Sequence, residues 1–154
     1  MKLNISMPME RLIFFKKKLG LEDKEMKRLN PYRNFFVSKK DDFSAFFHRY
    51  FLEIPETRII LEYKKERNRL PMKIWPRWFE SLFKKELDEG LMAFLWRSGL
   101  VHVEEKIDQR FINLGYAVVR QFCQKTAEEG IPSGDLNPVM RSIDKIIDFC
   151  VLAK

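Results

Sequence analysis

The chain contains 154 residues, of which 45% are hydrophobic and 33% are charged. This mixture is typical of a single globular domain with its own core, and it excludes a disordered or fibrous chain. No apolar run approaches the ~18 residues of a membrane span, and the N-terminus lacks the pattern of a secretory signal. The two cysteines, Cys123 and Cys150, form neither a disulfide framework nor a CxxC motif. We therefore expect a cytoplasmic protein with buried thiols and no membrane span.

The charge is unevenly distributed along the chain. Lys and Arg number 29 against 22 Asp and Glu, which gives a net charge of +7. Residues 1–80 carry 19 basic and 11 acidic groups, whereas residues 81–154 carry 10 and 11. A basic half can attract nucleic acid, an anionic membrane or an anionic ligand. Because these basic residues are spread over several predicted helices without a helix-turn-helix pattern, we interpret them as a solvated surface and do not expect nucleic acid as a partner.

The spacing of apolar residues predicts an all-α fold. Glycine occurs only six times, and strand-like alternation is scarce. From Phe43 to Ile54 the apolar residues follow a helical stripe, with Asp41 or Asp42 as its N-cap. Pro76 is expected to kink or restart the helix that begins at Pro71. The predicted helices, several short and suited to crossed packing, cover residues 8–18, 22–36, 41–54, 55–61, 71–83, 86–103, 108–128 and 136–152, with a loop at 130–134.

The residues that could carry catalysis do not form a recognisable site. The sequence lacks GxSxG, HExxH, glycine-rich phosphate loops and Asp-rich calcium loops. Its adjacent acidic pairs would point about 100° apart on a helix, which is typical of solvated charge. Both cysteines lie on apolar stripes and are expected to be structural. The sequence therefore predicts no enzyme.

The two histidines remain as candidate ligands. His102 follows Leu95 by seven residues and Ser98 by four, which places it on the inward face of its helix. His48 borders the apolar stripe on the side of Ser44. Neither has a second ligand at metal-cage spacing, so a structural zinc site is not expected. A single inward histidine is usually a core residue, but imidazoles on separate helices among many aromatic residues also suit a flat macrocycle with a central iron.

Four segments of the sequence resemble one family. RSGLVHVEEKIDQRFINLGYAVVRQF resembles the proximal region of the globin-coupled sensor and protoglobin branch of the globins. The matching positions in this string are His102, Ile107, Asp108, Phe111 and Tyr116. Upstream, FSAFFHRYFLEIPETRIIL and WPRWFESLF resemble the family's pre-distal and distal helices, and downstream LNPVMRSIDKIIDF resembles its closing helix. The order and spacing of these segments cover about residues 20–152.

The resemblance implies a globin fold of the sensor-globin type in one domain over residues 1–154. It implies an additional N-terminal helix within residues 1–20 and no separate helix between the one after Pro55 and the one that begins at Pro71. It also implies non-covalent haem b, with His102 as the proximal iron ligand. The residues expected to line the haem pocket are Phe43, Phe47, Phe51, Ile74, Trp75, Trp78, Ile107, Phe111 and Tyr116.

Two departures from the family pattern concern the surroundings of the iron. The family commonly has a distal tyrosine, and here that position falls on His48 in one register and on Phe47 in the other. His48 would be a distal iron ligand or a hydrogen-bond donor, whereas Phe47 would make the pocket apolar. After His102 the family usually has an apolar residue and a glycine, where this chain has Glu105 and Lys106. If the glycine position requires a positive φ, either Lys106 is strained or the helix continues through it.

The function implied by the resemblance is binding of a diatomic gas (O2, CO or NO) or redox sensing through the haem iron. In this family, dimers commonly form through the last two long helices, here 108–128 and 136–152. The sequence ends with the closing helix, so a signal would pass through such a homodimer or to a partner protein in trans. The alternative is a haem-free globin-fold module for signalling or interaction.

Overall fold

The computed structural model describes residues 6–66 and 71–153, and within these ranges it describes the side chains of all residues but 64–66 and 71–72. The described backbone is helical, with short connections. The elements are α1 (Met9–Lys18), α2 (Asp23–Lys27), the 3₁₀ turn η1 (Asn30–Tyr32), α3 (Arg33–Val37), α4 (Lys40–Leu52), α5 (Pro55–Glu66), α6 (Pro71–Ser81), α7 (Glu89–Glu104), α8 (Gln109–Gly130) and α9 (Ser133–Leu152).

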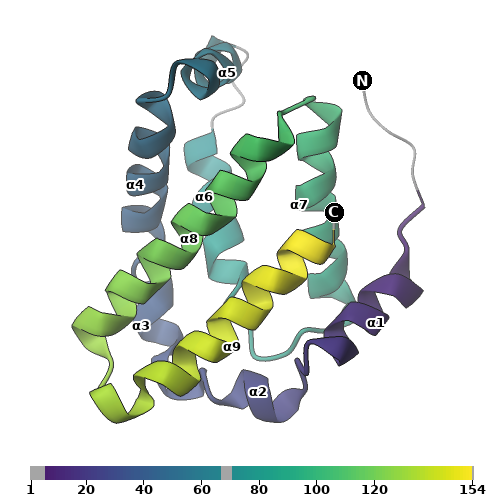
Figure 1. The fold of residues 1–154 in the computed structure, drawn as a ribbon, viewed down its shortest axis with the longest axis vertical. Helices are drawn as coiled ribbons and strands as arrows, with labels where there is room; N and C mark the ends of the chain where they lie inside the picture. Colours follow the sequence, from purple (N-terminus) through teal and green to yellow (C-terminus); the bar gives the residue numbers. More distant parts are fainter. Residues whose placement is uncertain (1–5, 67–70, 154) are drawn as a thin grey trace.

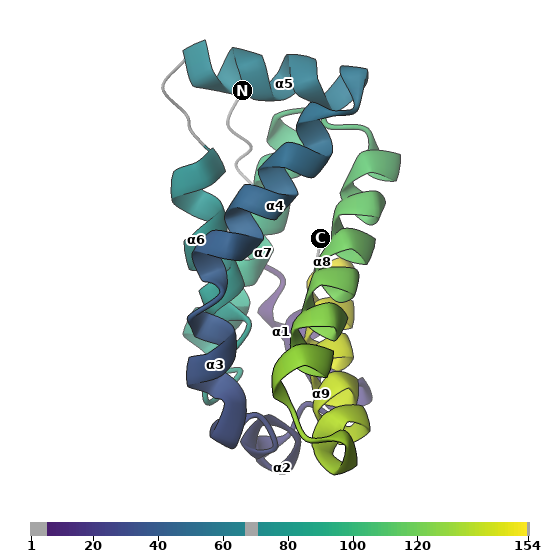
Figure 2. The ribbon, with the colours of Figure 1, turned by 90° about the vertical axis from the view of Figure 1, so that its left-hand side faces the viewer.

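Figure 1 shows α8 and α9 side by side, running in opposite directions and obliquely to the upright helices α4, α6 and α7. α4 packs mainly on α6, and α8 packs mainly on α9. Figure 2 shows α4, α6 and α7 on one side of the molecule and α8 and α9 on the other, with α5 across one end and α2 at the opposite end. α1 contacts both α7 and α9 at the edge of this arrangement. The expected all-α architecture with crossed helices is therefore observed.

Aromatic residues form much of the core between these helices. The Phe43 ring of α4 stacks on Phe79 of α6 at a centroid distance of 4.5 Å, and Phe122 of α8 meets Phe43 edge-on at 5.4 Å. Phe36 of α3 stacks on Phe83 at 4.7 Å. Such pairs contribute about 0.5–1.5 kcal/mol each beyond the burial of their surface. The aromatic excess of the sequence is therefore used mainly to join α3, α4, α6 and α8.

Two buried charged residues tie the short N-terminal helices to the rest of the chain. Arg33 donates to the carbonyl oxygens of Met26 and Phe83, both at 2.5 Å, and to that of Lys84. On the other side, Glu25 of α2 accepts a hydrogen bond from the Ser142 hydroxyl of α9 at 3.0 Å. These bonds fix α2 and α3 against the α6–α7 connection and against α9.

The structure corrects several predicted helix boundaries. Residues 22–36 form two short helices and a 3₁₀ turn rather than one helix, because Pro31 interrupts the hydrogen-bond ladder. Lys39, not Asp41 or Asp42, is the N-cap of α4, and the two aspartates lie within its first turn. α5 extends to Glu66, five residues beyond the predicted end.

Proline and glycine break the later helices less than expected. Pro76 lies inside α6, which continues through it as one helix. Only residues 131 and 132 separate α8 from α9, so the predicted loop at 130–134 is shorter than expected, and Pro138 is accommodated within α9. None of the helices in the described ranges is long and apolar enough to cross a membrane.

Candidate functional site

His102 lies in the last turn of α7. The start of this helix is fixed by Asp88, whose side chain accepts a hydrogen bond from the Leu91 amide at 2.8 Å. The residues one and two turns before His102, Gly99 and Leu95, are buried, so His102 continues the inward face of the helix. The His102 side chain is half-buried. Its Nδ1 atom is buried and makes no hydrogen bond within the described residues, although the residue has other interactions.

The backbone after His102 forms a Schellman motif that ends α7. The Ile107 amide donates to the carbonyl oxygen of His102 at 3.1 Å, and the Lys106 amide donates to that of Val103 at 3.1 Å. Lys106 adopts a φ of 55°, in the left-handed region. The resemblance aligns this position with a glycine of the family. Of the two alternatives for Lys106, strain or a continuing helix, the structure shows the first: the helix ends, and the lysine adopts a conformation that favours glycine. The motif holds the His102 peptide at a defined helix end.

Phe47 and His48 take different positions on α4. The Phe47 ring lies 4.9 Å from Phe51 and 4.7 Å from Trp75 of α6, measured between ring centroids. The tip of the Phe47 ring would lie 3.4 Å from a Cβ atom built on Gly115 of α8, so Phe47 extends into the space between α4, α6 and α8. His48 is half-buried, with its ring centroid 6.1 Å from that of Trp75. The geometry therefore favours Phe47 as the inward residue of the pair.

Most of the other predicted pocket residues belong to the hydrophobic core or pack against it, Ile107 included, whereas Ile74 and Phe111 do not. Trp78 links Phe43 and Tyr116, with centroid distances of 6.3 Å to each ring. Tyr116 is buried, and burial, followed by the nearby Cys150, raises the pKa of its hydroxyl. Ile74 instead exposes 59% of its surface, so it does not join this group. Ile107 and Phe111 are half-buried at the turn between α7 and α8.

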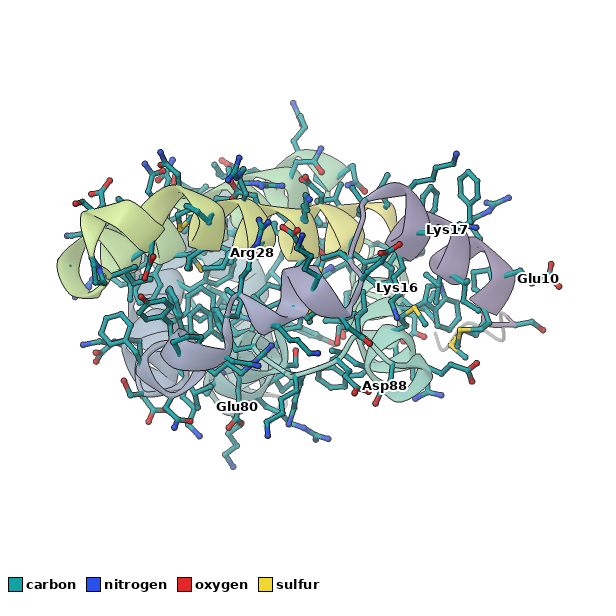
Figure 3. All side chains as sticks on the ribbon, turned by 90° about the horizontal axis from the view of Figure 1, so that it is seen from below. Glu10, Lys16, Lys17, Arg28, Glu80 and Asp88 are labelled. Atoms are coloured by element: carbon teal, nitrogen blue, oxygen red, sulfur yellow. The ribbon has the colours of Figure 1, made fainter. Side chains whose placement is uncertain are left out.

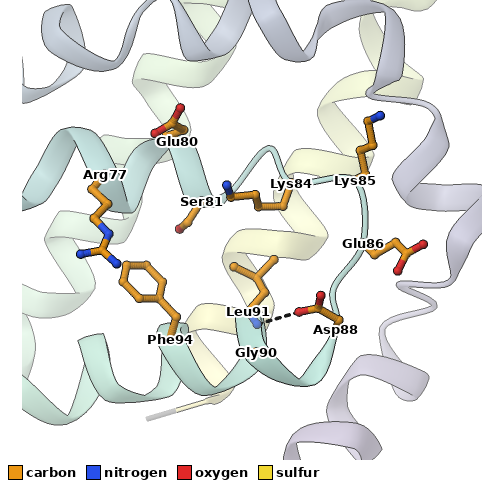
Figure 4. Close-up of a pocket in the computed structure, with 10 residues that line it drawn as sticks. All are labelled: Arg77, Glu80, Ser81, Lys84, Lys85, Glu86, Asp88, Gly90, Leu91 and Phe94. Atoms are coloured by element: carbon orange, nitrogen blue, oxygen red, sulfur yellow. Dashed lines mark hydrogen bonds between the residues drawn. The ribbon is translucent and has the colours of Figure 1, made fainter.

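Two surface grooves were not anticipated from the sequence. One, of about 720 Å³, lies between the end of α6 and the start of α7 (Figure 4). In it the Arg77 guanidinium lies 5.4 Å from the centre of the Phe94 ring. The other groove, of about 530 Å³, lies between α5 and the turn after His102 and is lined by Glu56, Ile60, Lys106, Asp108, Arg110 and Phe111. The first groove is formed by neighbouring residues of one segment, 77–94, whereas the second joins residues 56–60 to residues 106–111, which are distant in the chain.

The acidic N-cap of α8 is the clearest electrostatic feature near this turn. Asp108 accepts hydrogen bonds from the backbone amide of Arg110 at 2.8 Å and from its guanidinium, also at 2.8 Å. These bonds hold the pKa of Asp108 at about 2. The carboxylate is therefore ionised at neutral pH and stabilises the start of α8. Asp108 directly follows Ile107 in the chain.

Comparisons with known proteins identify the class of this fold. The family model of the protoglobins matches residues 9–151, and the chain therefore belongs to the protoglobin family. Among solved structures it is similar to the globin domain of a globin-coupled sensor from Geobacter sulfurreducens. The TM-score is 0.79 at 24% identity, over 90% of this chain and 92% of that one. A comparison with curated proteins gave no match. The predicted family and globin fold are thus confirmed.

Proposed function

We propose that this protein binds haem b non-covalently through His102 and acts as a globin-type gas sensor. Membership of the protoglobin family supports the gas-sensing role. The observation that carries the assignment to His102 is its place in the fold. It is an inward, half-buried imidazole in the last turn of α7, and Lys106, four residues later, ends the helix in the left-handed conformation. Haem would supply an iron that can bind a diatomic gas, and His102 would hold that iron.

The residues of the chain have distinct roles in this proposal. The neutral imidazole of His102 offers one nitrogen lone pair to iron, and the Schellman motif holds its peptide in place. Trp75 and Trp78 of α6 and Tyr116 of α8 provide flat, largely apolar surfaces of the kind that a porphyrin contacts. Burial raises the pKa of Tyr116, so its hydroxyl stays protonated and uncharged at neutral pH. The pocket then excludes water and charge from the ring.

On the distal side we propose that Phe47, rather than His48, faces the gas. Its contacts with Trp75 and its approach to Gly115 support this register. A phenyl ring donates no hydrogen bond, so bound O2 would lack the stabilisation that a distal tyrosine gives. Carbon monoxide depends less on such a donor, and we therefore expect a high ratio of CO to O2 affinity. In this arrangement His48 lies beside the pocket and is not an iron ligand.

Signalling would require a partner, either a second copy of the chain or another protein. Among the described residues with large exposed apolar side chains, only Leu152 belongs to α8 or α9. The outer face of this pair is instead polar, with Arg120 of α8 paired to Asp144 at 3.2 Å and to Asp148 of α9. A homodimer through these helices would therefore be held mainly by polar contacts, and its interface would be salt-sensitive.

Absorption spectroscopy of the purified protein, reconstituted with haem, tests the proposal. We expect a sharp Soret band in the ferric and dithionite-reduced states and a shift with CO. His102→Ala should abolish this band while leaving the helical circular dichroism unchanged. His48→Ala is the matched control, since it removes the other imidazole of the chain and should retain a five-coordinate reduced spectrum.

Two results would contradict the assignment. A low-spin reduced spectrum that is lost in His48→Ala would make His48 an iron ligand and overturn the distal role of Phe47. If wild-type protein gives no specific haem spectrum, the haem proposal fails, and the chain is a globin-fold interaction module instead.

A further inference from the structure

One face of α1 packs against the core of the protein and holds the helix in place. Leu12 is 1% exposed and belongs to the core, and Phe15 and Leu19 pack against that core. The Lys16 ammonium donates to the carbonyl oxygen of Leu87 at 2.8 Å, which ties the helix to the segment before α7. These contacts lie along one side of the helix, and the opposite side is not needed to hold it in place.

Two large apolar side chains lie on the outer face of α1. Ile13 is 44% exposed and Phe14 is 51% exposed. Arg11, Lys17 and Lys18 stand three residues before, three after and four after Phe14, so all three lie on its side of the helix. The Lys18 ammonium lies 5.6 Å from the centre of the Phe14 ring. A large aromatic side chain is therefore surrounded by cations and faces solvent.

The charge of this helix is strongly one-sided. Glu10 is the acidic residue of α1, against four basic residues at positions 11, 16, 17 and 18. Figure 3 shows α1 at an edge of the molecule, with Lys17 and Glu10 at its outside and Lys16 directed toward the body. α1 therefore lies at an edge of the molecule, and its exposed apolar pair faces solvent there.

We propose that this outer face of α1 binds the surface of a membrane that contains anionic lipids. Ile13 and Phe14 would enter the layer of headgroups, and Arg11, Lys17 and Lys18 would contact lipid phosphates, since their alkyl chains can lie along apolar surface while their charges reach the headgroups. The cations beside the apolar pair complement the negative charge of such headgroups, and a helix at the edge of the molecule can meet a flat bilayer. The helix lies along the surface and does not cross it. This function is independent of haem binding.

Co-sedimentation of the full-length protein with lipid vesicles tests the proposal. We expect binding to vesicles of phosphatidylcholine mixed with phosphatidylglycerol at low salt, weaker binding at high salt, and none to pure phosphatidylcholine. Each lysine near an anionic surface contributes about a fivefold increase in affinity, so Lys17→Glu with Lys18→Glu should weaken binding about 25-fold or more. Ile13→Ser with Phe14→Ser should also release the protein.

Matched variants separate this face from general properties of the protein. Lys73→Glu with Lys125→Glu leaves the same net charge as the α1 charge variant but changes exposed residues of α6 and α8. Ile59→Ser with Tyr63→Ser removes an isoleucine and an aromatic residue that are 67% and 49% exposed on α5. Both control variants should bind vesicles like the wild type.

Three results would overturn the proposal. The first is equal sedimentation with neutral and anionic vesicles, and the second is an equal loss in the control variants, which would mean that net charge alone is responsible. The third is that the α1 variants bind vesicles like the wild type but are monomers in analytical ultracentrifugation, where the wild type is a dimer. In that case a second copy of the chain, not a membrane, covers this face.

Discussion

At the end of α7, Lys106 adopts a φ of 55°, where a side chain with a Cβ atom is strained. Lys106→Gly should therefore raise the free energy of unfolding by about 0.5–1 kcal/mol, after the greater chain entropy of unfolded glycine is included. Equilibrium urea unfolding followed by circular dichroism measures this change. Because the Schellman hydrogen bonds use only backbone atoms, the helix end should keep its geometry.

Two variants isolate the backbone effect. Lys106→Ala keeps the Cβ atom and removes the charge, so it should change the free energy of unfolding little. If it raises that free energy as much as Lys106→Gly does, the Cβ atom of Lys106 causes no strain. Gly20, between α1 and α2, has a φ of 69° and is the inverse case. Gly20→Ala should lower the free energy of unfolding by about 1 kcal/mol.

The individual residues of the site differ in how far sequence could place them. The inward position of His102 follows from its spacing to Leu95, because helical periodicity fixes which side chains share a face. Phe47 lies on the apolar stripe and His48 borders it, but the distal position implied by the resemblance falls on one or the other according to the register, so the sequence alone does not choose between them. The structure separates them through the approach of Phe47 to Gly115, a contact between residues of different helices. Such contacts depend on helix packing, which the local pattern does not encode.

Among the elements, α3 is held by one buried guanidinium. Arg33 donates to Asn30 Oδ1 at 2.7 Å and to the three backbone carbonyls of Met26, Phe83 and Lys84. Burial lowers the pKa of Arg33, although arginine stays charged at neutral pH. Arg33→Met should lower the free energy of unfolding by about 2–4 kcal/mol, because the carbonyl oxygens of Phe83 and Lys84 lose their guanidinium donor and Met26 keeps only the backbone hydrogen bond from the Leu29 amide. Urea unfolding measures the loss.

An exposed arginine on another helix provides the comparison. Arg97→Met on α7 should change stability by no more than about 0.5 kcal/mol. Arg33→Lys retains the charge but cannot reproduce the planar fork, so it should recover only part of the loss. Full recovery by lysine would show that charge, not the set of hydrogen bonds, is what α3 requires.

The element boundaries show where local rules were overridden. The glycine at 130 predicts the start of a loop, but Gly130 is the last residue of α8 and the loop begins after it. A Cβ atom there would lie 2.1 Å from the tip of the Phe35 ring, so this glycine also allows α3 to approach α8. Arg33 gave no signal in the sequence, since two of its partners are the carbonyl oxygens of Phe83 and Lys84, 50 and 51 residues away. Helix existence could be predicted from apolar spacing, whereas these close approaches could not.

At the scale of the whole molecule, both thiols are sealed inside the packed helices. Cys123 of α8 is 0% exposed and Cys150 of α9 is 3% exposed. Burial raises the pKa of Cys150 to about 12 and raises that of Cys123 well above its ordinary value of 9.0. In the unfolded chain these thiols ionise near pH 9, whereas in the folded protein they stay neutral. The stability that the neutral buried thiols give the folded protein is therefore fully present below pH 9 and is lost as the pH rises from about 9 toward 12.

The free energy of unfolding should accordingly fall above pH 9, by up to about 1.4 kcal/mol per pH unit for each thiol. Urea unfolding at a series of pH values measures this slope. Cys123→Ala with Cys150→Ala should be less stable at neutral pH, since two buried side chains are truncated, but should show a shallower alkaline slope. Tyr116 leaves a residual decline above about pH 10, because burial also raises the pKa of its hydroxyl. If the double variant shows the same alkaline slope as the wild type, groups other than the two thiols cause the loss of stability. The thiols would then be solvated in the native state.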